Sequence, residues 1–195
     1  TFSGCTGLAN ITIPDSVIFI GNDTFSGCTG LTSITIPDSV TYIGNYAFSD
    51  CTGLTSVTIP DSVEILGSGV FSHCISLTSI TIPDSVTSIG DSAFYGCTGL
   101  TSITIPGNVT HIDGAPFAFC KSLVNIIVDN NNEKYSSNDG VLFNKEQTLL
   151  VQYPAGKQNS TYAIPYGVTD VGYGAFIQCE TLMDVTIPDS VTNIG

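Results

Sequence analysis

The chain repeats one pattern of hydrophobic and polar positions with a period of 23 residues. Residues 77–99 read LTSITIPDSVTSIGDSAFYGCTG, and residues 31–53 match them at 18 of 23 positions. Strict periods of roughly 20 to 29 residues are typical of solenoids, in which each repeat covers the hydrophobic face of its neighbour. The pattern predicts a single solenoid over residues 1–195. The leading leucines of the repeats are Leu8, Leu31, Leu54, Leu77, Leu100, Leu123 and Leu182.

Each repeat contains two extended segments separated by a proline turn. In LTSITI (77–82), Leu77 and Ile80 are placed to face inward from a strand, and the Thr and Ser residues face outward. Pro83 cannot donate to a strand ladder, so the strand ends there in the turn PDSV. A second short segment, VTSI (86–89), sends apolar side chains inward and ends at a glycine that permits a tight bend.

The remaining part of the repeat predicts a short helical or 3₁₀ turn. In SAFYGC (92–97), Phe94 and Cys97 would face inward, and Gly99 would end the turn. The residue before this segment is of a type that caps helix N-termini in successive repeats. These capping candidates are Asn22, Asn45, Ser68 and Asp91.

The repeat resembles the leucine-rich repeat superfamily, and within it the bacterial-surface type named after the BspA adhesin. The shared pattern is C-x-x-L-x-x-I-x-I-P-x-x-V-x-x-I-G-x-x-A-F, and it covers essentially the whole chain. The resemblance implies a leucine-rich-repeat solenoid of the α/β horseshoe class. It would be β-rich, with parallel stacked short strands and short helical or 3₁₀ turns. Because the sequence opens and closes within a repeat, we expect it to be a fragment of a longer protein.

Charge excludes some partners. The chain has 17 acidic and 4 basic residues, giving a net charge of −13. Such a charge repels phosphate backbones and anionic membrane surfaces, so we expect no nucleic acid and no membrane docking. No apolar run is long enough to span a bilayer, so the sequence predicts no membrane insertion. The many Thr, Ser, Asn and Gly residues are common in secreted and surface proteins.

Six cysteines follow the 23-residue step, and the seventh comes after an insertion. Cysteines at one phase point into one column of the core, with neighbours about 4.8 Å apart. That spacing permits disulfides by distance, but parallel side chains favour free thiols that donate to backbone carbonyls. One column cannot converge on a metal ion. We therefore expect a buried structural thiol ladder, with disulfides and a metal site as weaker alternatives. The ladder comprises Cys5, Cys28, Cys51, Cys74, Cys97, Cys120 and Cys179.

The sequence offers no convincing catalytic group and no cofactor motif. His73 lies beside Cys74, but that cysteine belongs to the buried column, so a Cys–His nucleophile is disfavoured. The aspartates after the turn prolines read as turn residues that accept backbone N–H groups, and calcium bridging between repeats is the alternative. This aspartate column comprises Asp15, Asp38, Asp61, Asp84 and Asp189.

Threonine columns line the outward face of the first extended segment. Exposed β-branched residues reflect strand propensity, and ordered water or ice binding is an alternative that face curvature disfavours. We expect this face to present a sheet-like surface to a protein or glycan partner. Its candidate contact residues are Thr35, Thr58, Thr81 and Thr104.

An insertion interrupts the repeat. The step from Cys120 to Cys179 is 59 residues, so 36 residues are added. GVLFN and TLLVQY flank KEQ, which predicts a β-hairpin within an inserted element at 130–161, and the rest reads as polar loop. Loops on rigid scaffolds often carry function, so this segment is a candidate partner contact or else a variant structural repeat. The candidate contact residues are Lys121, Lys134, Tyr135, Phe143, Lys145, Tyr153 and Lys157.

These features predict a non-enzymatic, adhesin-like binding module at the cell surface or in the extracellular space. Its partner would be a host or extracellular protein or a glycan, contacted by the repeat face and by residues 121–157. A structural stalk or spacer within a larger surface protein is the alternative. Deletion of 130–160 should abolish binding while leaving the solenoid folded. Uncapped end repeats could also pair edge to edge.

Overall fold

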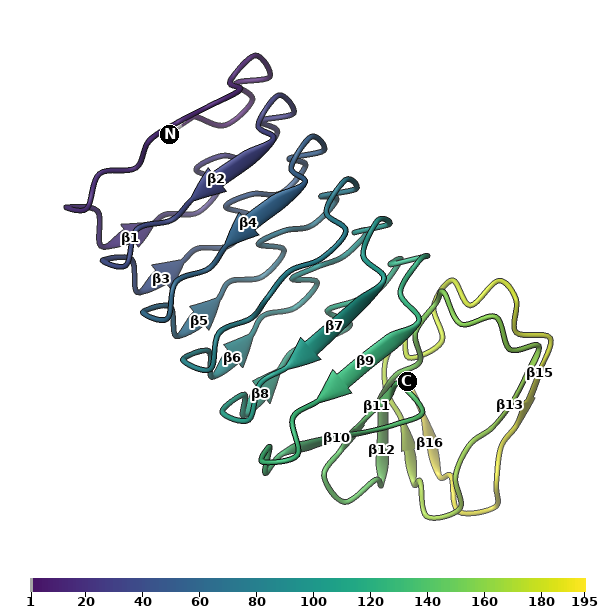
Figure 1. Cartoon of the computed structure of the whole chain (residues 1–195). Helices are drawn as coiled ribbons and strands as arrows, with labels where there is room; N and C mark the ends of the chain where they lie inside the picture. Colours follow the sequence, from purple (N-terminus) through teal and green to yellow (C-terminus); the bar gives the residue numbers. More distant parts are fainter. Residues whose placement is uncertain (1) are drawn as a thin grey trace.

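The computed structural model describes residues 2–195 as a solenoid of strands and turns, with coils stacked along one axis (Figure 1). A regular coil has three sides. The front segment corresponds to residues 77–82, the back segment to residues 86–89 and the turn segment to residues 91–97. Equivalent residues of neighbouring coils lie 23 positions apart in the parallel ladders. The predicted leucine-rich-repeat solenoid is therefore confirmed.

The back segments form a continuous five-stranded parallel sheet. A glycine follows most of these strands and allows the coils to approach closely. A Cβ atom on Gly67 would lie 2.6 Å from the backbone nitrogen of Asn45 in the preceding coil. The sequence assigned Gly90 to a tight bend, but its φ is not left-handed and an added Cβ would lie 2.6 Å from the nitrogen of Ser68, so close stacking is what requires glycine there. The strands are β1 (Phe19–Ile20), β3 (Tyr42–Ile43), β5 (Ile65–Leu66), β6 (Ser88–Ile89) and β8 (His111–Ile112).

The front segments form separate pairs of parallel strands. In the region that the structure describes, no ladder joins residues 77–82 to either neighbouring coil. The coils are therefore joined more regularly on the back than on the front, although the sequence pattern gave the front segment the longer strand. The pairs are β2 (Ser33–Thr35) with β4 (Ser56–Thr58), β7 (Ser102–Ile105) with β9 (Asn125–Val128), and β13 (Thr161–Ala163) with β15 (Asp184–Thr186).

The turn segments contain no helix within residues 2–195, so the predicted helical turns are wrong. Tyr46 and Asp50 have left-handed φ values of 55° and 57°, which a right-handed helix cannot accommodate. Their N–H groups donate to the next coil, to the carbonyls of Ser68 and Ser72, both at 2.8 Å. The expected cap Asn45 likewise bonds between coils, because its Oδ1 accepts the N–H of Ser68 at 2.8 Å.

The regular coils share one hydrophobic core with repeated columns of identical side chains. Phe48 stacks on Phe25 and Phe71 with ring centroids 5.3 and 5.5 Å apart. Leucine, isoleucine and valine columns from the front and back segments fill the rest of this core. A second cluster, which includes Phe143 and Tyr153, occupies the C-terminal coils. The insertion therefore lies where one core gives way to the next.

The insertion starts a new sheet beneath the last regular coils (Figure 1). The predicted hairpin around residues 145–147 is present, and one further strand precedes it. That first strand pairs antiparallel with the second across the turn Asp139–Gly140. The sheet contains β10 (Tyr135–Asn138), β11 (Val141–Asn144), β12 (Leu149–Gln152), β14 (Asp170–Val171) and β16 (Asn193–Ile194).

Candidate functional surface

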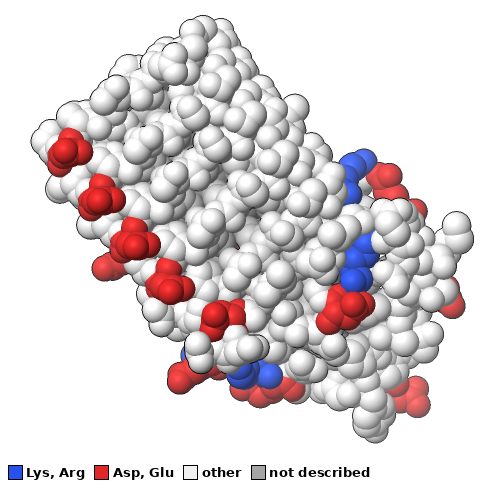
Figure 2. Space-filling model, in the orientation of Figure 1, with Lys and Arg blue, Asp and Glu red and all other residues white. Residues whose placement is uncertain are grey.

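The front side of the regular coils is a polar, uncharged face. Its outward positions carry hydroxyl side chains in successive coils, and Figure 2 shows a broad area without charged groups on the side where the front strands lie. The four threonines predicted as contacts are all exposed on this face. The neighbouring outward column is also exposed and consists of Ser33, Ser56, Ser79 and Ser102.

A row of acidic side chains follows one edge of this face (Figure 2). Its regular members Asp15, Asp38, Asp61 and Asp84 are exposed. The turn is closed by the backbone, because Val86 N donates to the carbonyl of Pro83 at 3.1 Å, and Ser85 Oγ donates to the carbonyl of Val63 in the preceding coil at 2.7 Å. All four aspartates lie in the turns as predicted, but among residues 2–195 none of their carboxylates accepts a backbone N–H, so the predicted acceptor role is wrong. The described residues also contain no cluster of three or more His, Cys, Asp or Glu side chains that could hold a metal.

Three residues predicted as partner contacts on the insertion are buried. Phe143 and Tyr153 belong to the C-terminal core, with 0% and 1% of their surfaces exposed. Lys157 is only 8% exposed, and its Nζ donates to the Asp139 carbonyl at 2.7 Å and pairs with Asp139 Oδ2 at 3.1 Å. The predictions for these three residues are wrong, because the insertion provides core as well as surface.

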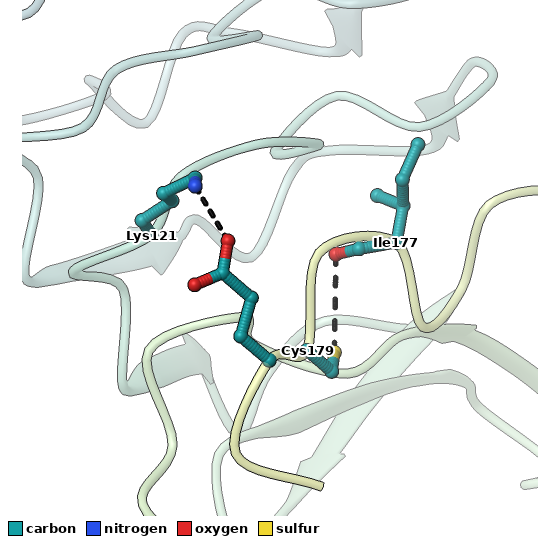
Figure 3. Close-up of polar contacts among 4 residues, drawn as sticks. Lys121, Ile177 and Cys179 are labelled. Carbon is teal, nitrogen blue, oxygen red and sulfur yellow. Dashed lines mark hydrogen bonds and ion pairs between the residues drawn. The ribbon is translucent and has the colours of Figure 1, made fainter.

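The other predicted contacts on the insertion reach solvent to different degrees. Lys134 and Lys145 are exposed, and Lys145 Nζ donates to the carbonyl of Asn132. Tyr135 is half-buried, and its hydroxyl accepts the N–H of Ile112 at 2.9 Å. Lys121 is exposed and forms an ion pair with Glu180 at 2.5 Å (Figure 3). The ion pair of Lys121 therefore joins a regular coil to the C-terminal coils, whereas Lys145 bonds within the insertion.

The insertion completes the open edge of β9. Ile126 N donates to the carbonyl of Gly140 at 2.9 Å, and Gly156 N donates to the carbonyl of Leu123 at 2.8 Å. The side chain of Ser137 accepts the N–H of Val128 at 3.0 Å. Because the segment also supplies core residues, removal of 130–160 would open both cores. The expectation that the solenoid would stay folded without it conflicts with these contacts.

The extra strand β10 was missed by the sequence pattern, although one signal was present. Asp139 and Gly140 both have positive φ, 49° and 73°, as two-residue hairpin turns require. The dipeptide Asp-Gly is a strong signal for such a turn. The strand itself was not recognised, because its residues are mostly polar and do not alternate between hydrophobic and polar positions.

The cysteines are free, and five of them are buried in one column. Burial raises the pKa of Cys51 and of Cys120 to about 12. Cys5 is exposed, so its predicted place in the buried ladder is wrong. Cys179 is only partly buried, with its Sγ 3.8 Å from the carbonyl oxygen of Ile177 (Figure 3). His73 packs edge-on against Tyr95 with ring centroids 5.1 Å apart. Nothing in the described residues places a histidine to activate a thiol.

The stacked coils, the phenylalanine and cysteine columns and the 23-residue register define a leucine-rich-repeat β-solenoid. The chain belongs to the BspA type leucine rich repeat family. Six copies of the family's repeat region match residues 1–72 and 155–195. No curated protein matches the chain, and no helix able to span a membrane occurs within residues 2–195.

Several solved bacterial structures are similar. A leucine-rich repeat protein from Eubacterium ventriosum is 32% identical with a TM-score of 0.82, covering 91% of this chain and 47% of that one. A leucine rich cell surface protein from Faecalibacterium prausnitzii is 37% identical with a TM-score of 0.76, covering 93% and 55%. The pneumococcal vaccine antigen PcpA is 26% identical with a TM-score of 0.74, covering 85% and 47%. The chain therefore spans about half the length of these structures.

Proposed function

We propose that the chain is part of a non-enzymatic binding module at the cell surface, contacting a protein or glycan through its front face. The observation that carries the proposal is the broad uncharged face with regular hydroxyl columns. Lys134 and Lys145 are exposed on the insertion and are further candidate contacts. Similarity to a leucine rich cell surface protein and to a vaccine antigen supports a surface location.

The mechanism is multivalent contact on a rigid support. Each coil offers the same small set of hydroxyl groups, so one coil contributes little affinity and several coils together contribute much. The back sheet and the phenylalanine column hold the coils in register. Catalysis would need different groups converging in one cleft, whereas repetition places like groups in lines.

A spacer is the second candidate function. The continuous back sheet and the stacked aromatic rings favour a stiff rod that separates other domains. A spacer requires no partner on the front face. The two functions therefore predict different results when that face is changed.

Arrays of glycans and extracellular-matrix proteins test the proposal. The variant Thr58→Glu/Thr81→Glu places charge on the front face, and Thr41→Glu/Thr87→Glu places the same charge on exposed back segments. The wild-type chain should bind at least one array member, the front variant should lose most of that signal, and the back variant should keep it. Absence of any bound member, or equal loss in both variants, would overturn the proposal in favour of a spacer.

The array samples must be monomeric, because the end coils expose apolar side chains. Phe19 is 62% exposed in β1, the first strand of the back sheet, and Ile194 is 67% exposed in β16, the last strand of the C-terminal sheet. Edge-to-edge pairing of end coils remains a prediction. Light scattering across a concentration series measures it directly.

A further inference from the structure

The acidic edge is interrupted at Gly107. This position carries aspartate in earlier coils, and glycine removes the side chain. The backbone at Gly107 has no left-handed φ, and the nearest atoms to an added Cβ would be Asn131 Cβ at 3.5 Å, Asp129 Oδ1 at 3.6 Å and the carbonyl carbon of Asn131 at 3.8 Å. Those are ordinary van der Waals distances. Neither backbone conformation nor coil stacking requires glycine there, in contrast to Gly67.

The missing side chain opens a polar hollow. A cavity of about 180 Å³ is lined by Asp84, Gly107, Asn108, Asp129 and Asn131. A second hollow of about 280 Å³ shares three of these residues and extends to Thr110, Glu133 and Lys134. The combined groove lies where the regular coils meet the insertion. Most of its lining residues are polar, and Val109 is its one large apolar side chain and is buried, so it offers little apolar anchor for a peptide side chain.

A buried asparagine fixes the walls of this groove. Asn132 is fully buried, and its Nδ2 donates to the carbonyls of Pro106 at 2.7 Å and Val109 at 3.0 Å. Its Oδ1 accepts the N–H groups of Lys134 at 2.9 Å and Tyr135 at 2.7 Å. One side chain thus bonds the turn of a regular coil to the first residues of the insertion. The groove is therefore held in shape before any ligand arrives.

Several polar groups in the groove retain free hydrogen-bonding capacity. Asn108 uses its Nδ2 on the carbonyl of Asp84 at 2.8 Å, which leaves its Oδ1 open. Asp129 Oδ1 accepts the N–H of Asn131 at 2.8 Å, which leaves the second carboxylate oxygen. Within residues 2–195, no hydrogen bond engages the side chains of Asn131 or Lys134. Amide, carboxylate and ammonium groups together suit a ligand with several hydroxyls.

We propose that this groove is a subsite for one neutral sugar unit of a glycan. The inference deepens the proposed binding function by assigning a ligand class and a place. The hydroxyls of the sugar donate to the carboxylates of Asp84 and Asp129 and to the amide oxygens, and they accept from Asn131 and Lys134. Three carboxylates against one ammonium make the groove negative, so it rejects sialylated and sulfated sugars.

Nuclear magnetic resonance on ¹⁵N-labelled chain tests the subsite through the side-chain amides of Asn108 and Asn131. The neutral probes are lactose, a mannose trimer and a β-1,4-linked glucose tetramer, and sialyllactose is the charged match to lactose. A separate titration uses calcium chloride without any sugar. At least one neutral probe should shift both amide signals in a saturable manner, whereas sialyllactose should not.

Gly107→Asp is the decisive variant, because it restores the residue of the other coils and fills the hollow. Binding should weaken at least tenfold while the unfolding temperature stays the same or rises, since replacing an unconstrained glycine reduces the entropy of the unfolded chain. Asp61→Gly removes the same side chain at a position followed by Ser62 instead of an asparagine, and it should gain no binding. No shift with any neutral sugar, equal binding by Gly107→Asp, or a response to calcium alone would overturn the subsite. Array binding that survives Gly107→Asp would remove only the subsite and leave the proposed function standing.

Discussion

The Sγ atom of Cys74 lies 3.2 Å from the carbonyl oxygen of Phe48, which precedes it by 26 residues. The same contact occurs at 3.1 Å between Cys97 and Phe71 in the next coil. Each thiol therefore satisfies a backbone carbonyl of the coil before it while filling a fully buried position. The cysteine column connects coils by hydrogen bonds without any covalent link.

Replacement of Cys74 by alanine should destabilise the fold. The substitution removes a buried sulfur atom and one of two donors to the carbonyl of Phe48, which keeps only the N–H of Cys51 at 3.3 Å, and together these losses should cost about 1–3 kcal/mol. Cys5 is exposed, so Cys5→Ala should change the free energy of unfolding by no more than about 0.5 kcal/mol. Urea denaturation of both variants measures the difference. Equal losses of stability in the two variants would show that the buried cysteine column does not stabilise the fold.

Stability should fall as the pH rises above 9. Burial raises the pKa of Cys51 and Cys120 from 9.0 to about 12 in the folded chain. Between pH 9 and about 12 the unfolded chain loses these protons while the folded chain keeps them, so alkali favours the unfolded state. Urea denaturation at pH 7, 9, 10 and 11 should give a declining free energy of unfolding. A Cys51→Ala/Cys120→Ala variant should show a shallower decline, whatever its stability at pH 7.

The repeat register, the inward positions and the turn prolines could be predicted because each depends on local pattern alone. Leu77 and Val86 are fully buried, as their spacing indicates. The bonding between coils could not be predicted, because it depends on the distance between backbones. Asn45 is the clearest case: a side chain suited to a helix cap instead accepts an N–H from the next coil. A helix cap and an acceptor for the next coil both need a short polar side chain at this position, so the sequence does not distinguish them.

The insertion was predicted least well, since its buried and its exposed residues lie in sequence stretches of similar composition. Lys157 and Lys134 lie in comparable polar stretches, yet the first is buried against Asp139 and the second is exposed. Only the three-dimensional position of the new sheet separates them. The groove at Gly107 was also missed, although the loss of aspartate from a regular column was visible in the sequence.

Glycines that separate neighbouring coils should not tolerate alanine. A Cβ at position 90 would lie 2.6 Å from the backbone nitrogen of Ser68, and backbone cannot move aside cheaply. Gly90→Ala should therefore cost about 1–3 kcal/mol, as overpacking usually does. Gly7 has open space around its Cβ position and an ordinary φ, so Gly7→Ala should be neutral or slightly stabilising. Thermal unfolding compares the two, and a tolerated Gly90→Ala would contradict the close-stacking role.

The ion pair of Lys157 should matter more than that of Lys121. Lys157 is 8% exposed and donates to the carbonyl of Asp139, so Lys157→Met leaves an acceptor inside the insertion unpaired and should cost about 1–3 kcal/mol. The side chains of Lys121 and Glu180 are 49% and 65% exposed, so Lys121→Met should cost no more than about 1 kcal/mol.

Urea denaturation at low and high salt separates these two cases. Salt should weaken both carboxylate pairs, because Glu180 and Asp139 are 65% and 78% exposed, but the loss in Lys157→Met should persist, because it includes the hydrogen bond of a buried lysine to the Asp139 carbonyl. Protection of the Gly140 and Gly156 segments against hydrogen exchange should fall in Lys157→Met and stay normal in Lys121→Met. Similar losses in the free energy of unfolding for both variants would mean that the buried lysine does not hold the insertion. The hydrogen bonds to β9 and the core residues alone would then keep the insertion in place.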